Sequence, residues 1–184
     1  MFQPLAIPDV ILVTPKRHGD SRGFFAETYR ENDYAEAGIH GPFVQDNQAF
    51  SENAFILRGL HFQTPPAAQA KLISCSRGRI LDVAVDLRRS SPSFGTYVSA
   101  ELSAETGQQL YIPAGFAHGY LTLTPACEVR YKVTAYYSPK HERGLAWNDP
   151  DIGIEWPVTE RQPVCSGKDL ELPRLKDLGP TLFE

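Results

Sequence analysis

Hydrophobic and polar positions alternate over short distances along most of this chain. Runs rich in Val, Ile, Leu, Thr and Tyr are separated by turn-forming clusters such as SRG, SPSFG and PAG, as expected of a protein built from β-strands. The clearest alternation puts Ile80 and Asp82 on one face of a strand and Leu81 and Val83 on the other. The pattern predicts strands over residues 10–14, 70–76, 79–87, 96–102, 108–113, 117–123 and 128–137.

Helical patterning is weak by comparison. Residues 32–38 form the main helical candidate, with Asn32 as its N-cap and Gly38 as its stop, and a weaker turn follows Asp149. Pro and Gly residues lie between the predicted strands and are not gathered into a linker. Many short strands joined by regular turns favour an all-β sandwich or barrel, most simply a jelly roll.

Length, charge and cysteine content narrow the functional classes. A chain of 184 residues is long enough for one domain with a substantial core. Its formal net charge of −4 gives no general attraction to nucleic acid or to a membrane surface, so an anionic ligand needs a local basic cluster. No stretch approaches the roughly 20 apolar residues of a membrane span, and the N-terminus lacks the regions of a signal peptide. Three widely spaced cysteines without a CxxC pair are expected to be buried or incidental thiols in a reducing cytoplasm.

Two polar residues interrupt the apolar stretch LRGLHFQ at 57–63. In a flat strand Arg58 and His61 would point to opposite faces, but Gly59 marks a possible bulge that would bring them to one side. The alternative is an Arg58 that extends to solvent at an edge and a His61 with satisfied hydrogen bonds in the core.

Further candidates for a site lie downstream. Lys71 opens a predicted strand, where it could also be an ordinary edge lysine. Pro113, Gly115 and His118 form a PxGxxH motif similar to the second motif of cupin barrels, in which the histidine usually ligates a metal. Here the HxH of the first motif is replaced by His61-Phe62-Gln63 and no suitably spaced Glu follows, so the roughly three ligands of a metal site are not expected.

Several longer stretches together carry a more specific resemblance. They include RGLHFQ followed by Lys71, then GFAHG, and a YY–WNDP block, and they span residues 19–29, 45–47, 57–66, 69–75, 78–95, 102–123, 131–157 and 166–169. Over nearly its whole length the chain resembles the dTDP-4-dehydrorhamnose 3,5-epimerase family, the sugar-nucleotide epimerase branch of the cupins. The resemblance implies a cupin-type double-stranded jelly-roll barrel with a few short helices. It also implies a single domain over 1–184, a C-terminal segment of about 158–184 that closes over the site, and a homodimer in which strand 10–14 could pair with a partner's sheet.

The resemblance implies an isomerase without a cofactor that acts on a dTDP-4-keto-6-deoxy sugar. Hydrogens on carbons 3 and 5, on either side of the ketone, are removed and returned on the opposite face. His61 is similar to the family's base and Asp169 to the residue that orients it, as in other His–Asp pairs. Lys71 matches the cation that stabilises the enolate. Tyr131 matches the proton donor, although an ordinary strand tyrosine would have the same spacing.

The same matching implies a set of substrate contacts. Cations are expected to contact the diphosphate, because Arg and Lys suit phosphate oxygens. His118 is expected to contact the sugar. Phe25 is expected to stack on thymine, with packing in the core or in a dimer as the alternative. The full set is Arg22, Phe25, Glu27, Gln45, Asp46, Asn47, Arg58, His118, Tyr137, Glu142 and Lys168. Three residues depart from the family pattern and are expected to alter the pocket: Ala49, Phe55 and Tyr111.

Alternative functions remain open from the sequence. A single-carbon epimerase for a specialised deoxysugar would use the same residues, and a cupin that only binds a nucleotide sugar would not need Tyr131 or the His61–Asp169 pair. A metal-dependent oxygenase is a weaker alternative. By resemblance, rhamnose for a cell-surface polysaccharide is the expected product pathway, with no nucleic acid or membrane partner.

Overall fold

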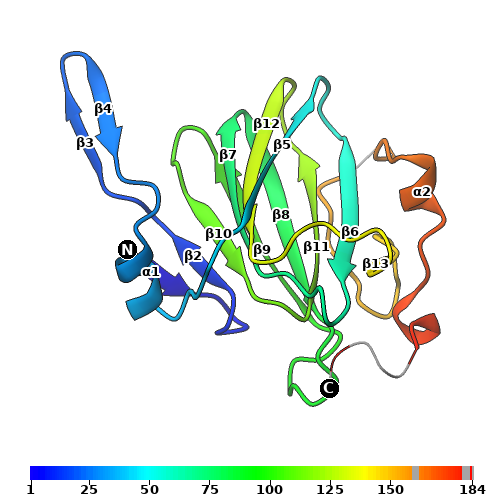
Figure 1. Cartoon of the computed structure of the whole chain (residues 1–184). Coiled ribbons are helices and arrows are strands. Elements are labelled where there is room, and N and C mark those ends of the chain that lie inside the picture. The colour runs from blue at the N-terminus through cyan, green and yellow to red at the C-terminus, as the bar shows by residue number, and fades with distance from the viewer. Residues whose placement is uncertain (159–161, 180–182, 184) are drawn as a thin grey trace.

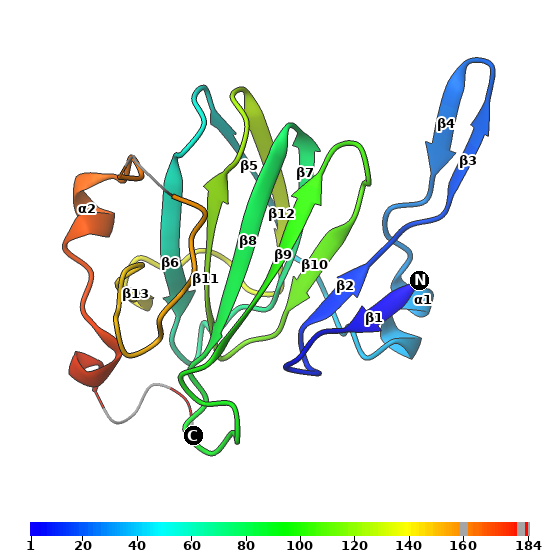
Figure 2. The same cartoon turned by 180° about the vertical axis from the view of Figure 1, so that it is seen from behind.

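Two antiparallel sheets face each other in the computed structural model, which describes residues 1–158, 162–179 and 183 (Figures 1 and 2). The six-stranded sheet has the order β1 (Phe2–Pro4), β2 (Ile11–Val13), β10 (Gln109–Ile112), β7 (Lys71–Arg77), β12 (Cys127–Val133) and β5 (Gln45–Ser51). The five-stranded sheet has the order β13 (Glu142–Gly144), β6 (Leu57–Gln63), β11 (Phe116–Thr122), β8 (Arg79–Asp86) and β9 (Tyr97–Ser103). The predicted double-stranded jelly-roll barrel of the cupin type is confirmed.

The remaining elements lie outside the barrel. A hairpin of β3 (Arg17–Asp20) and β4 (Gly23–Ala26) projects away from it, while α2 (Gly167–Leu170) lies on the opposite side (Figure 1). A short helix α1 (Glu31–Glu36) packs near the start of the chain, and a 3-10 turn covers Leu175–Asp177. None of the described helices is long and apolar enough to cross a membrane.

All seven predicted strands are present, with ends that differ by a few residues. The largest difference between a predicted and an observed strand end is in the strand predicted over 128–137. It ends at Val133, because β12 pairs with its neighbours β7 and β5 no further than Lys71 and Gln45. Side-chain amides of Gln63 and Gln69 then bind the backbone carbonyls of the following loop. The sequence pattern missed β1, β3, β4, β5 and β13, which are short or polar and depend on their partners for pairing.

Two finer expectations are wrong. The helix α1 begins one residue before Asn32, so Asn32 lies inside the helix and Arg30 occupies the N-cap without a side-chain cap. The strand expected at 10–14 has no free edge for a partner's sheet, because β2 lies between β1 and β10 in its own sheet.

The alternation predicted for β8 distributes its apolar side chains between two of the three hydrophobic clusters of the described residues. Ile80 and Ala84 point into the core between the sheets. Val83 and Val85 point outward, where they pack with Leu178 and other residues of the C-terminal segment. Because both faces of β8 are covered, the five-stranded sheet is held rigidly behind the site.

Strand β6 contains one extra residue relative to β11. His61 pairs with His118 and Arg58 pairs with Tyr120, so three steps along β6 match two steps along β11. Directly opposed residues of an antiparallel pair point to the same face, and His118 and Tyr120 share a face. The bulge therefore puts Arg58 and His61 on one side of the sheet, as the glycine between them predicted.

We predict that Gly59→Ala destabilises the protein by about 2–4 kcal/mol. Gly59 has φ of +123°, and an added Cβ would lie 2.6 Å from Gly119 Cα and 2.8 Å from the His118 carbonyl oxygen. Thermal unfolding measures the loss. Gly167→Ala is the control, because a Cβ there meets nothing within 4 Å, and equal stability of the two variants would contradict the close approach of β6 and β11.

Candidate active site

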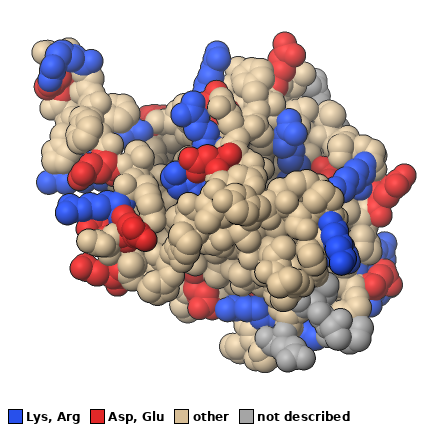
Figure 3. Space-filling view, viewed as in Figure 1, with Lys and Arg blue, Asp and Glu red and all other residues tan. Residues whose placement is uncertain are grey.

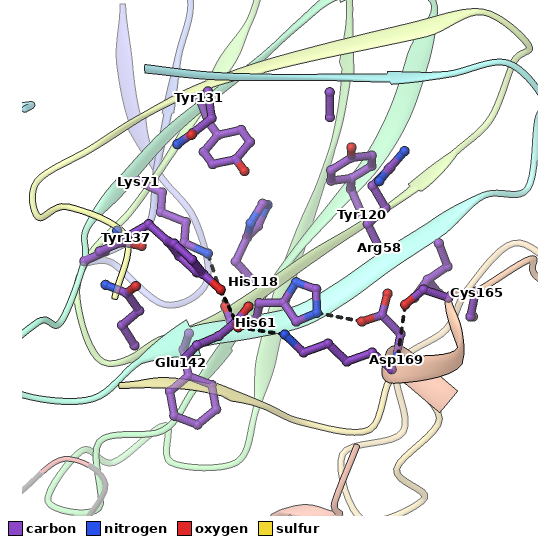
Figure 4. A pocket seen from close by; sticks show the side chains of 18 of the residues that line it. Arg58, His61, Lys71, His118, Tyr120, Tyr131, Tyr137, Glu142, Cys165 and Asp169 are labelled. Atoms are coloured by element: carbon purple, nitrogen blue, oxygen red, sulfur yellow. Dashed lines mark hydrogen bonds and ion pairs between the residues drawn. The ribbon is translucent and has the colours of Figure 1, made fainter. Parts of the chain in front are cut away.

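A cavity of about 650 Å³ opens at one end of the barrel between the two sheets (Figure 4). Strands β5, β6, β7, β11, β12 and β13 contribute to its wall, together with the loop after β12, the segment that leads into α2, and α2 itself. Eleven of the predicted site residues line it, namely Gln45, Asn47, Arg58, His61, Lys71, His118, Tyr131, Tyr137, Glu142, Lys168 and Asp169. The predicted sharing of one cavity by Arg58 and His61 is confirmed.

A short polar contact in the cavity joins β6 to α2. His61 Nε2 lies 2.6 Å from Asp169 Oδ1, and Asp169 is buried. The second carboxylate oxygen lies 3.5 Å from the backbone N–H of Gly59, at the limit of a hydrogen bond. Ser166 caps α2 by accepting a hydrogen bond from the Asp169 backbone N–H. The carboxylate is thus fixed against the histidine at the bulge.

This contact decides which nitrogen of His61 is available. A carboxylate accepts hydrogen bonds, so Nε2 carries the hydrogen towards Asp169 and Nδ1 is left facing the cavity (Figure 4). Burial lowers the pKa of His61 below its ordinary value, although the Asp169 carboxylate opposes the shift. Neutral His61 therefore predominates at pH 7 and can accept a proton at Nδ1.

A buried ammonium lies next to this histidine. Lys71 Nζ donates to the His61 backbone carbonyl oxygen over 3.2 Å. Burial lowers the pKa of Lys71 to about 8, while the negative charges of Asp82 and Glu142 hold it from falling further. Lys71 is therefore still mostly charged at neutral pH and presents a desolvated cation to the cavity.

A second histidine–carboxylate pair lies behind the cavity. His118 Nε2 is 2.6 Å from Oδ1 of Asp82, and both side chains are buried. Asp82 is on β8, directly opposite Tyr120 of β11 in the sheet. The pair fixes the orientation of the His118 ring at the cavity wall.

Tyrosines and one ion pair complete the rim. Tyr131 points into the cavity from β12 (Figure 4), and burial raises the pKa of its phenol, which stays protonated at neutral pH. Tyr137 donates a 2.9 Å hydrogen bond to Glu142 Oε2, and Lys168 Nζ lies 2.7 Å from the same oxygen. These contacts link the loop after β12 to α2 at the mouth of the cavity.

At the other end of the cavity Arg58 extends from β6. Its side chain donates to the Phe50 carbonyl oxygen at 3.1 Å and to Ser51 Oγ at 3.4 Å. Gln45 and Asn47 of β5 hydrogen-bond each other over 2.8 Å at the wall. On the face of the molecule that Figure 3 shows, basic and acidic side chains are interspersed.

Four predicted site residues lie outside this cavity. Arg22 and Phe25 are on the projecting β3–β4 hairpin and Glu27 follows it directly. Phe25 is 67 % exposed, so the expectation that it packs in the core is wrong. Asp46 lies between Gln45 and Asn47 on β5, so its side chain points to the opposite face of the sheet. There it forms an ion pair with Lys132 over 3.0 Å. Within a single chain these four cannot contact a ligand bound beside His61.

Sequence reasoning also missed several residues of the wall. Tyr120, Gln63, Gln69, Cys165 and Ser166 line the cavity. Two of them carried a signal, because Tyr120 lies two residues after His118 and Gln63 two residues after His61, on the same strand face in each case.

Of the three departures from the family pattern, Ala49 lines the cavity. Phe55 and Tyr111 are not among the lining residues: Phe55 has φ of +61° before β6, and Tyr111 packs in a separate cluster under α1. Neither side chain forms part of the cavity wall. Among the described residues, no three His, Cys, Asp or Glu side chains converge as a metal ion would require.

Comparisons with known proteins all point to one family. The family model of dTDP-4-dehydrorhamnose 3,5-epimerases matches residues 4–177. The dTDP-4-dehydrorhamnose 3,5-epimerase of Salmonella typhimurium is 50 % identical over 171 residues, which cover 92 % of each chain.

Two solved structures are informative. The dTDP-6-deoxy-D-glucose-3,5-epimerase of Legionella pneumophila, in complex with dTDP-4-keto-L-rhamnose, is 40 % identical with a TM-score of 0.94, covering 100 % of this chain and 96 % of that one. A 3'-monoepimerase of Streptomyces bikiniensis, in complex with dTDP-quinovose, is 35 % identical with a TM-score of 0.88, covering 95 % and 87 %. With a family model over most of its length and a relative at half identity, this chain belongs to the dTDP-4-dehydrorhamnose 3,5-epimerase family.

Proposed function

We propose that this protein epimerises dTDP-4-dehydro-6-deoxy-D-glucose at carbons 3 and 5 to dTDP-4-dehydro-L-rhamnose, in dTDP-rhamnose biosynthesis. The observation that carries the proposal is the His61–Asp169 pair, with Lys71 beside it and Tyr131 facing it across one cavity, in a chain of this family (Figure 4). The reaction is an isomerisation, so the carbon skeleton and the oxidation state of the sugar are unchanged.

The first step is removal of a proton next to the ketone. His61 Nδ1 takes the proton from carbon, and the C–H electron pair moves into an enolate whose negative charge lies on the ketone oxygen. Asp169 stabilises the imidazolium that forms. The buried ammonium of Lys71 stabilises the enolate oxygen as its charge develops.

The second step returns a proton to the opposite face of the sugar. Tyr131 suits this role because its phenol is protonated at neutral pH and points into the cavity opposite His61. Each inversion leaves His61 protonated and Tyr131 as a phenolate. Before the second carbon is inverted, His61 must release its proton and the phenolate must gain one, by exchange through solvent.

Binding of the nucleotide is assigned to the rim. Arg58 and Lys168 are the cations proposed for the diphosphate, with Gln45, Asn47 and Tyr137 as further contacts. His118 is proposed to contact the sugar. Glu142 currently binds Lys168 and Tyr137, so its role would be to position them.

The projecting hairpin supports the proposal of a homodimer. Arg22 and Phe25 lie on the hairpin that projects from the barrel and Glu27 follows it, and Phe25 is largely exposed. They would contact a nucleotide if the hairpin of one copy reached the cavity of its partner, which would give Phe25 a thymine to stack on.

Two coarser expectations are also kept as proposals. Residues 1–184 would act as a single domain in which the segment from about 158 onwards closes over the site, with α2 supplying Asp169 and Lys168 to the cavity wall. The nucleotide-sugar substrate and free cysteines suit a cytoplasmic location.

A single-carbon epimerase is the second candidate. It is favoured by the structural likeness to the Streptomyces bikiniensis 3'-monoepimerase and by Ala49 in the cavity wall. A protein that only binds nucleotide sugars would have no use for a base fixed by a carboxylate opposite a buried phenol.

Incubation with the dTDP-4-keto-6-deoxyglucose substrate in deuterated water tests the function. We expect deuterium at both carbon 3 and carbon 5, read by nuclear magnetic resonance. His61→Ala should abolish exchange at both while leaving dTDP binding largely intact, and His40→Ala, at an exposed histidine, is the matched control. Exchange at one carbon would support the second candidate, and exchange retained in His61→Ala would place the base elsewhere.

Tyr131→Phe separates proton removal from proton return. Without the phenol O–H the enolate still forms, so this variant should exchange deuterium while net inversion falls by about 100-fold or more. Product analysis alongside the exchange measurement gives both rates. Inversion at the wild-type rate would show that another group is the acid.

The pH dependence of kcat/KM should be bell-shaped. Activity falls as pH decreases through the lowered pKa of His61, because the protonated ring cannot act as a base. Activity falls again as pH rises through about 8, where Lys71 loses its charge. Lys71→Arg should lower activity but remove the alkaline limb, because Arg stays charged. An alkaline limb unchanged in that variant would contradict the role of Lys71.

A further inference from the structure

Tyr120 has a buried hydroxyl with no partner at the edge of the cavity. Its side chain is 4 % exposed and lines the cavity from β11, two residues after His118 and on the same face. Among the described residues no group forms a hydrogen bond of good geometry with its hydroxyl oxygen, and Ser51 makes only a weak contact that lowers the pKa of the phenol slightly. Buried hydroxyls nearly always have a hydrogen-bond partner, because a buried hydroxyl without one has lost its hydrogen bonds to water and gained none in return. An unpaired one at a cavity wall indicates that the ligand supplies the partner.

The neighbours of Tyr120 indicate what that ligand group is. Arg58 is directly opposite Tyr120 in the β6–β11 pair, and Figure 4 shows the hydroxyl end of Tyr120 and the nitrogen end of Arg58 on the same side of the cavity. Arg58 is exposed and uses Nε and Nη2 for Ser51 and Phe50. Its Nη1 is therefore available to an anionic oxygen.

The phenol of Tyr120 is suited to donate a hydrogen bond and resists ionisation to a phenolate. Burial raises the pKa of Tyr120 well above its ordinary value, and the positive charge of Arg58 only partly opposes this. The hydroxyl thus keeps its hydrogen at any working pH. A phenol O–H beside a guanidinium forms a two-residue donor set that matches a phosphate oxygen.

We propose that Tyr120 is a substrate-specificity residue whose hydroxyl donates to an oxygen of the diphosphate held by Arg58. This inference rests on the proposed function, because it needs a nucleoside diphosphate in the cavity. It assigns Tyr120 to ground-state binding at the end of the cavity away from Lys71, so its loss should affect KM and leave kcat nearly unchanged.

Tyr120→Phe tests the assignment with dTDP as the probe. Calorimetry should show dTDP binding weakened about 10- to 100-fold, the usual effect of one hydrogen bond to a charged group. Binding of thymidine, which lacks phosphate, should not change. The midpoint of thermal unfolding of the free protein should stay the same or rise, because the hydroxyl that is removed has no partner there.

Tyr34→Phe is the matched control. Tyr34 is also 4 % exposed, but its hydroxyl donates to Thr28 O at 2.6 Å and lies 2.8 Å from Gln109 Oε1. This variant should lower the unfolding midpoint by a few degrees and leave dTDP affinity unchanged.

Three results would overturn the assignment. Unchanged dTDP affinity in Tyr120→Phe, with wild-type protein that binds dTDP, would show that the hydroxyl does not contact the diphosphate while the proposed function stands. Equal weakening of thymidine binding would place the contact on the nucleoside. Failure of the wild-type protein to bind dTDP at all would remove the proposed function and this inference with it.

Discussion

The close approach of β6 and β11 at two glycines is the constraint on which the site depends. Gly59 and Gly119 face each other with no room for a side chain on either, and the extra residue in β6 lies at this point. Without the bulge Arg58 and His61 would point to opposite faces of the sheet. With it, one strand end presents a cation and a base to the same cavity, and the backbone N–H of Gly59 approaches the carboxylate that orients the base.

Burial and charge work against each other around this strand. Removal from water lowers the pKa of both His61 and Lys71. A lower pKa keeps His61 neutral, as a base must be. The same shift favours loss of the Lys71 proton, and with it the positive charge that stabilises the enolate. The carboxylates near Lys71, on Asp82 and Glu142, oppose that loss. A neutral base and a charged lysine can therefore coexist in the same cavity near neutral pH.

The site is assembled from both ends of the fold. The barrel supplies the base, the cation and the phenol, while α2 supplies Asp169 and Lys168. That helix is held by a bridge between Val164 and Ile56 and by Leu172, which packs where a side chain on Gly144 would otherwise lie. A carboxylate 108 positions from its histidine is thus brought to 2.6 Å by packing of the C-terminal segment.

Local patterning determined the barrel and much of its cavity. Alternation and turn residues located seven strands, because a half-buried strand has apolar and polar side chains in alternate positions of the sequence. Motif resemblance singled out His61, Lys71, Tyr131 and Asp169. Tertiary structure alone decided the rest. It placed Asp46 on the far face of β5 and the hairpin residues away from their own cavity, and it left the Tyr120 hydroxyl without a partner. Which face a polar strand turns inward, and which buried group stays unpaired, depend on neighbours distant in sequence, so no local pattern could reveal them.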